Sequence, residues 1–173
     1  MARLKCAVLI SGRGSNLDAL IEACAASDFP AEIVLVISNV PGAGGLAHAE
    51  KANIPARVVD HKKFAGREAF EARLTQALAQ SGAELVCLAG FMRLLTPSFV
   101  ARWQGRLINV HPSLLPAYPG LDTHARALAD GAKEAGCTVH YVVAEMDAGP
   151  IIVQARVPVR PGDDADTLAA RVL

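Results

Sequence analysis

The sequence of 173 residues predicts one α/β domain, residues 1–173, built on a doubly wound, mostly parallel sheet. Short apolar runs alternate with helical patterns along the whole chain. Several of these runs are rich in β-branched residues and lack polar alternation, as is typical of parallel strands covered on both faces. No repeat, low-complexity segment or linker interrupts the alternation, so we expect no internal domain boundary.

Each element has its own local signal. The predicted strands are short apolar runs: Leu4–Ile10, Ile33–Ser38, Ala56–Val59, Leu85–Ala89, Leu107–Val110, Thr138–Val143 and Ile151–Val157. Helical patterns follow them at Ser15–Ala26, Gly44–Ala52, Arg67–Ser81, Pro97–Trp103, Thr123–Asp130 and Asp164–Val172. Thr96 before Pro97 is a strong helix start, because a hydroxyl caps the first turn and proline fits its first position. The last helical pattern stops at Leu173 without a stop signal, so we expect the natural chain to continue.

Composition excludes several classes of protein. Lys+Arg and Asp+Glu number 17 each, so the net charge is zero and we expect no nucleic-acid partner. Hydrophobic residues make up 52%, enough for a buried core, but no run reaches the roughly 18–20 residues that span a bilayer. The start of the chain lacks the layout of a signal peptide. The cysteines form no CxxC pair, so we expect buried reduced thiols in a cytoplasmic protein.

A glycine-rich turn, Ser11–Leu17, follows the first strand and leads into a helix. Its glycines permit a tight turn and close approach of a ligand, and the free N–H groups of the first helical turn favour an anion. A dinucleotide fingerprint needs a glycine in place of Leu17 and an acidic residue near Asn39, and neither is present. A small phosphate-bearing substrate fits best, and an ordinary βα turn is the alternative.

Asn109 and His111 stand two residues apart at the end of a strand, so we expect their side chains on the same face. Open α/β sheets bind ligands at the carboxyl ends of their strands. Histidine exchanges protons near neutral pH, and asparagine can donate to an oxyanion. Three prolines within Pro112–Pro119 stiffen the loop that follows. A structural histidine at a strand end is the alternative.

Asp147 follows a later strand in a loop that contains Gly149 and Pro150. If it lies against His111, its charge would orient the imidazole and favour the protonated form. An Asx-turn is its commoner use. The segment Ala89–Leu95 carries apolar residues that should turn inward, or that could form an apolar wall for a flat ring.

The other candidate residues carry weaker signals. His48, His61, His124 and His140 have no metal-ligand spacing, so we expect no metal site. Ser11, Ser15 and Ser113 lack the Gly-x-Ser-x-Gly elbow of serine hydrolases.

Together, these motifs resemble the phosphoribosylglycinamide formyltransferase family, the folate-dependent enzymes of purine synthesis. The matching stretches are Ile10–Leu17, Leu88–Leu95, Leu107–Gly120 and Glu145–Pro150, and the similarity runs along essentially the whole chain. The resemblance implies a Rossmann-like sheet and transfer of the formyl group from 10-formyltetrahydrofolate, a co-substrate, to the amine of phosphoribosylglycinamide. It implies a monomer or homodimer acting on small molecules, with no metal, nucleic-acid or membrane partner.

The resemblance also implies roles for individual residues. Gly14, Ser15 and Asn16 would hold the substrate phosphate. The folate would contact Arg67, Met92, Arg93, Leu94, Leu95, Asn109 and the loop of Val143, Ala144, Glu145, Met146 and Asp147. Asn109, His111 and Asp147 would be catalytic: the first two would bind the oxyanion, and Asp147 would keep His111 charged and aimed. The family continues past the position of Leu173 with an acidic residue that contacts the glycinamide end.

Three alternatives remain. Formyltetrahydrofolate deformylase is similar around Asn109–Pro116 but uses water as the acceptor and usually has an additional amino-terminal domain. Methionyl-tRNA formyltransferase shares the His-Pro-Ser-Leu-Leu-Pro core but lacks the Gly-Ser-Asn loop. A non-catalytic domain that binds a phosphorylated metabolite belongs to a different class, and the intact set of Asn109, His111 and Asp147 argues against it.

Overall fold

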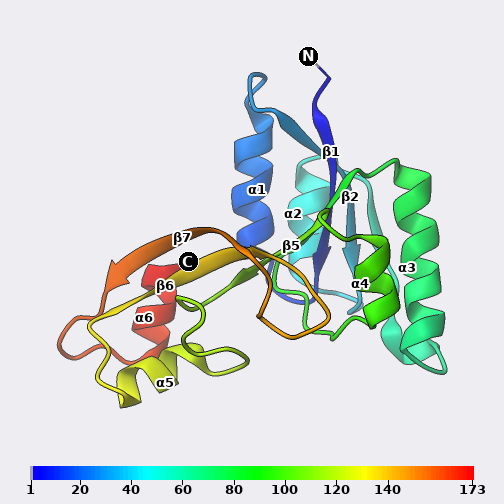
Figure 1. Cartoon of the computed structure of the whole chain (residues 1–173). Coiled ribbons are helices and arrows are strands. Elements are labelled where there is room, and N and C mark those ends of the chain that lie inside the picture. Colours follow the sequence, from blue (N-terminus) through cyan, green and yellow to red (C-terminus); the bar gives the residue numbers. More distant parts are fainter. Residues whose placement is uncertain (1) are drawn as a thin grey trace. The chain divides into compact units, whose positions relative to one another are not determined.

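The computed structural model describes residues 2–173 and contains two compact units, residues 2–107 and residues 108–173 (Figure 1). The division falls within the strand β5 (Leu107–His111). In residues 2–173, no helix combines the length and apolar character needed to cross a membrane.

The first unit is built on four parallel strands in the order β3-β2-β1-β4. Their bounds are β1 (Leu4–Ile10), β2 (Ala31–Ser38), β3 (Ala56–Val58) and β4 (Leu85–Leu88). The central strand β1 is the most buried, because Ala7, Val8, Leu9 and Ile10 are all 0% exposed. This continuous apolar run is the pattern of a strand covered on both faces.

Helices cover both faces of these four strands (Figure 1). The bounds are α1 (Ser15–Ala25), α2 (Gly45–Lys51), the 3₁₀ turn η1 (His61–Lys63), α3 (Arg67–Ser81) and α4 (Pro97–Arg102). Right-handed crossovers place α1 and α2 on one face and α3 on the other. The core of this unit lies between helices and sheet, where Leu17, Leu74 and Leu78 are fully buried.

The second unit has the antiparallel order β5-β6-β7, with β6 (Glu134–Tyr141) and β7 (Ile151–Pro158). The helices α5 (Thr123–Ala129) and α6 (Ala165–Val172) lie side by side against these strands (Figure 1). Leu168 anchors α6 in the core, and Asp164 caps the helix by accepting a 2.7 Å hydrogen bond from the Thr167 N–H.

The predicted elements are all present, and their bounds differ by a few residues. β1 and α3 begin and end where predicted. Thr96 caps α4 as expected, since its hydroxyl accepts a hydrogen bond from the Phe99 N–H at 3.3 Å. The predicted range of β6, Thr138–Val143, is wrong at both ends, because the strand runs from Glu134 to Tyr141. Glu134 pairs with Pro158 of β7, and Tyr141 pairs with Ile108 of β5. The predicted strand therefore wrongly included Val143.

Candidate active site

Asn109 and His111 lie at the end of β5, on the same face of the strand as expected. β5 pairs with β6 in antiparallel register, which sets Asn109 opposite His140 and His111 opposite Thr138. Directly opposed residues in such a pair have neighbouring side chains. The register therefore gathers four polar side chains at one place in the sheet of the second unit.

The His111 imidazole is held from two sides. The residue is 5% exposed, its Nε2–H donates to the Tyr118 carbonyl at 2.9 Å, and its Nδ1 lies 3.5 Å from Asp147 Oδ2. Both ring nitrogens thus face oxygen atoms that can only accept. The doubly protonated imidazolium is the form that offers an N–H to each of them.

Asp147 lies in the loop between β6 and β7, with φ at +54°, a conformation that aspartate tolerates better than most residues. Its Oδ2 accepts a 2.8 Å hydrogen bond from the Gly120 N–H. Its Oδ1 lies 4.0 Å from His140 Nε2, and its side chain is 10% exposed. The carboxylate therefore lies between two imidazoles, and the expected proximity of Asp147 to His111 is observed.

His140 is a site residue that the sequence did not indicate. It is 2% exposed, and its Nδ1–H donates to the Tyr141 carbonyl at 2.9 Å. Its Nε2 is therefore free to accept, and it faces Asn109 Nδ2 at 3.3 Å. This contact engages one N–H of the amide and leaves the other for a ligand. The antiparallel register of β5 and β6 is the signal that would have found His140.

The loop after His111 is fastened by hydroxyl groups. Ser113 Oγ donates to the Ala117 carbonyl at 2.6 Å and also lies 3.1 Å from the Tyr118 carbonyl. Thr138 Oγ1 donates to the Ser113 carbonyl at 2.7 Å and accepts from the Leu115 N–H at 3.0 Å. These bonds, added to the prolines, fix the carbonyl to which His111 donates.

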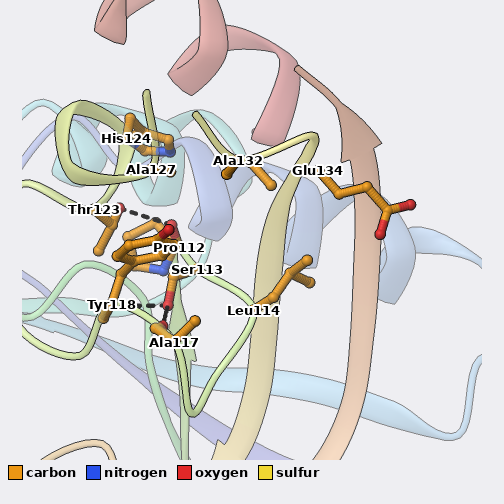
Figure 2. A pocket seen from close by; sticks show the side chains of 11 residues that line it. Pro112, Ser113, Leu114, Ala117, Tyr118, Thr123, His124, Ala127, Ala132 and Glu134 are labelled. Carbon is orange, nitrogen blue, oxygen red and sulfur yellow. Dashed lines mark hydrogen bonds between the residues drawn. The ribbon is translucent and has the colours of Figure 1, made fainter. Parts of the chain in front are cut away.

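A pocket of about 240 Å³ lies beside this loop (Figure 2). Ser113 and Tyr118 line one part of it, and Thr123 and His124 line another, with Thr123 Oγ1 donating to the Pro112 carbonyl at 2.8 Å. Burial lowers the pKa of His124, which favours its neutral form. Asn109, His111 and Asp147 do not line this pocket.

In the first unit, the glycine turn serves packing as well as access. Gly14 has φ at +82°, and a Cβ there would lie 2.5 Å from the Gly45 Cα. Glycine is therefore required for the contact between the start of α1 and α2, a packing role that the sequence did not indicate beside the tight turn and the approach of a ligand. Ser15 is exposed and Asn16 is half-buried, at the end of α1 whose N–H groups favour an anion.

The segment after β4 differs from its predicted orientation. The expectation that its apolar residues turn inward is wrong for Met92 and Leu94, which are 67% and 62% exposed. Phe91 occupies the inward position instead, at 8% exposed. The exposed pair fits the other expectation, an apolar wall for a flat ring.

Of the remaining residues expected to contact folate, Arg67 and the start of the loop after β6 lie at the surface, whereas Arg93, Leu95 and Asn109 are half-buried and Asp147 is 10% exposed. Arg67 is exposed at the first position of α3, and Arg93 Cζ lies 5.7 Å from the centroid of the Phe70 ring. Val143, Ala144, Glu145 and Met146 are exposed in the loop after β6. Within residues 2–173, no group of three or more His, Cys, Asp or Glu side chains is placed to hold a metal ion.

Comparison with known proteins identifies the class. The profile described as Formyl transferase matches residues 4–173, and the chain belongs to this family. Within it, the chain is 47% identical over 165 residues to the phosphoribosylglycinamide formyltransferase of Escherichia coli K12, covering 95% of this chain and 78% of that protein.

A second relative is the trifunctional purine biosynthetic protein adenosine-3 of Drosophila melanogaster, 55% identical over 172 residues. The match covers 98% of this chain and 13% of that much longer protein. Among solved structures, phosphoribosylglycinamide formyltransferase from Brucella melitensis has a TM-score of 0.95 and 54% identity, covering 98% of this chain and 88% of that one. The likeness confirms the α/β, mostly parallel, Rossmann-like fold class.

Proposed function

We propose that the chain transfers the formyl group of 10-formyltetrahydrofolate to the amine of 5-phosphoribosylglycinamide, a step of purine biosynthesis. Membership of the formyl transferase family supports a folate-type co-substrate. The observation that carries the proposal is the cluster of Asn109, His111 and Asp147, in which the imidazole and the carboxylate approach to 3.5 Å. We expect the protein to act in the cytoplasm on small molecules, as a monomer or a homodimer.

The reaction needs a site that stabilises an oxyanion. The neutral glycinamide nitrogen attacks the formyl carbon, a C–N bond forms, and the carbonyl oxygen takes the negative charge. The bond from carbon to folate N10 then breaks, and the proton lost by the amine balances the one gained at N10. Positioned hydrogen-bond donors in a water-poor site provide the main stabilisation for such charge.

Asn109 and His111 are the donors in this proposal. Asn109 keeps one amide N–H that His140 does not engage. His111 already donates to a neutral carbonyl, that of Tyr118, and a charged oxygen is a stronger acceptor that can replace it. Asp147 compensates the charge of the imidazolium and, through the Gly120 N–H, is itself held in place. Positioning of the two substrates provides the rest.

Most of the proposed binding residues lie in loops or at the first positions of helices, whereas Asn109 lies on β5. Gly14, Ser15 and Asn16 would hold the phosphate at the start of α1, where helix N–H groups favour an anion. Arg67, Met92, Arg93, Leu94 and Leu95 would contact the folate, together with Asn109 and the loop of Val143, Ala144, Glu145, Met146 and Asp147. The exposed apolar side chains of Met92 and Leu94 suit a flat ring.

The test is release of tetrahydrofolate with and without phosphoribosylglycinamide. We expect release to depend on this acceptor and to match formyl-glycinamide ribonucleotide in amount. The His111→Ala variant, prepared in the same way, controls for background hydrolysis. Equal release without the acceptor would identify a deformylase that uses water, and binding of substrate without any turnover would indicate a non-catalytic domain.

A further inference from the structure

The carboxylate of Glu71 is buried, and the proposed chemistry does not use it. Glu71 lies on α3 at 4% exposure, and in the described part of the chain no Lys, Arg or His nitrogen lies within ion-pair distance of it. Burying a carboxylate is costly unless hydrogen bonds compensate it. An apolar side chain would fill the same space at a lower free-energy cost. Packing alone therefore does not explain a carboxylate at this position.

Both oxygens of Glu71 are bound by one residue, Thr96. Oε1 accepts from the Thr96 backbone N–H at 2.7 Å, and Oε2 accepts from the Thr96 hydroxyl. The same hydroxyl caps α4 by accepting from the Phe99 N–H at 3.3 Å. Glu71 thus fixes the end of the segment Gly90–Leu95 against α3.

The start of that segment is fixed as well. The Met92 N–H donates to Ser11 Oγ at 2.8 Å, and the Ser11 N–H donates to the Gly90 carbonyl at 3.1 Å. Phe91 packs inward with its ring stacked on that of Phe70, at 6.5 Å between centroids. Between the two fixed ends, only Met92 to Leu95 are left to face a ligand.

We propose that Glu71 is a positioning residue that holds Met92–Leu95 in the shape that receives the folate ring. This inference rests on the proposed function, because that function assigns the segment to folate. Met92 and Leu94 expose apolar side chains at 67% and 62% that an unrestrained loop would fold inward. Holding them outward before the ligand arrives reduces the ordering cost of binding.

The main variant is Glu71→Gln, which preserves shape and one acceptor but loses the charged bond to the Thr96 hydroxyl. We expect the KM for formyl folate to rise about three- to tenfold, with kcat and the KM for phosphoribosylglycinamide within about twofold of wild type. Calorimetric affinity for tetrahydrofolate should fall by the same factor. Glu50→Gln, the same change at an exposed helix position, should alter neither value.

A second pair of variants acts from the other side of the contact. Thr96→Val removes the hydroxyl and should raise the folate KM as Glu71→Gln does, whereas Thr96→Ser keeps the hydroxyl and should restore it. Hydrogen exchange reports the loop without any substrate: the amides of residues 92–96 should exchange faster in Glu71→Gln and Thr96→Val. Faster exchange together with weaker tetrahydrofolate binding supports the inference.

Two results would overturn it, and both leave the proposed function standing. One is unchanged exchange of these amides in Glu71→Gln, and the other is faster exchange with unchanged folate KM and affinity. If the wild-type chain neither binds tetrahydrofolate nor transfers formyl groups, the proposed function fails and the assignment of Glu71 to folate fails with it. The exchange data would then still decide whether Glu71 orders the loop.

Discussion

The proposed catalytic cluster and the loops proposed to bind folate are built in opposite ways. His111 and His140 are 5% and 2% exposed, and each is held by hydrogen bonds to backbone or side chain. Met92, Leu94 and Met146 are 67%, 62% and 59% exposed. His111 and His140 are thus embedded in the β5–β6 strand pair of the second unit, whereas Met92, Leu94 and Met146 are exposed in loops.

This difference in exposure predicts that the buried side chains determine turnover and that the exposed side chains determine the affinity for folate. A buried, cross-linked donor keeps its geometry when no substrate is present, which is what oxyanion stabilisation requires. An exposed apolar side chain contributes area to a bound ring and little to the folded core. Substitutions in the first group should therefore change kcat, and those in the second should change KM.

The largest effect is expected from His111→Ala. Loss of one oxyanion donor lowers turnover by about 10²–10³, while calorimetric binding of folate changes little because the ligand loops are intact. Measurement of kcat and of binding in the same preparation separates the two. Turnover near that of wild type would refute the catalytic role of His111.

A smaller loss of turnover is expected from Asp147→Asn, about 10- to 100-fold, because the amide can still accept from the Gly120 N–H but carries no charge. Without the negative charge, the contact that orients the His111 imidazole is weakened, so kcat should fall. Steady-state kinetics at pH 7 checks this value. A kcat equal to that of wild type would separate the two residues.

The glycine turn should respond in stability. In Gly14→Ala, the new Cβ meets the Gly45 Cα at 2.5 Å, and we expect a loss of about 2–3 kcal/mol in urea unfolding. Gly42→Ala is the matched control, because Gly42 also has a positive φ, +72°, but nothing lies within 4 Å of its Cβ. The control should lose only about 1 kcal/mol, the cost of the left-handed backbone. Equal losses would mean that the contact with α2 contributes nothing.

A substitution in the exposed segment Met92–Leu95 should change KM and leave kcat unchanged, the opposite of the effect expected at His111. Leu94→Ala should raise the KM for formyl folate about threefold, with kcat unchanged and stability within about 0.5 kcal/mol of wild type. Steady-state kinetics and thermal unfolding check both values. A fall in kcat at constant KM would contradict the separation of chemistry from affinity.

The smallest effect is expected at the ion pair between Asp163 and Arg171, which connects α6 to the turn before it. This pair belongs neither to the proposed catalytic cluster nor to the loops proposed to bind folate. Arg171 donates to both oxygens of Asp163 at 2.6 and 2.7 Å, and this lowers the pKa of Asp163 to about 2. A carboxyl with a lowered pKa stabilises the fold above its ordinary value and loses that contribution as pH falls towards 2. Asp163→Asn should therefore lower the Tm at pH 7, and the effect should shrink as the pH falls towards 2. Glu134→Gln, at an exposed pair, should be neutral at both.

The regular elements were predictable because their signals are local. β1 contains the unbroken apolar run Cys6–Ile10, and α3 is the longest of the helical patterns. The predicted bounds of both elements agree with the structure. The proximity of His111 to Asp147 was only conditional in the sequence, since 35 intervening residues had to be folded first. His140 was missed, because its role depends on strand register.

The orientation of side chains in loops was also predicted poorly from the sequence. Periodicity assigns apolar residues to the interior, and that rule fails at Met92 and Leu94. The segment is fixed at its ends by Ser11 and Glu71, which are distant in sequence. The packing of Gly14 against Gly45 was not predictable, since no local pattern reveals a contact between two helices.

The pairing of Asn109 with His140 makes the proposed site depend on the register between β5 and β6. Strand side chains alternate, so a slip of β6 by one position would put Val139 or Tyr141 opposite Asn109 and turn the imidazole to the other face. Such a molecule would keep its hydrogen-bonded ladder and most of its circular dichroism, yet it would be inert. Specific activity per folded molecule therefore measures whether β5 and β6 have paired in the correct register, which spectroscopy of secondary structure does not reveal.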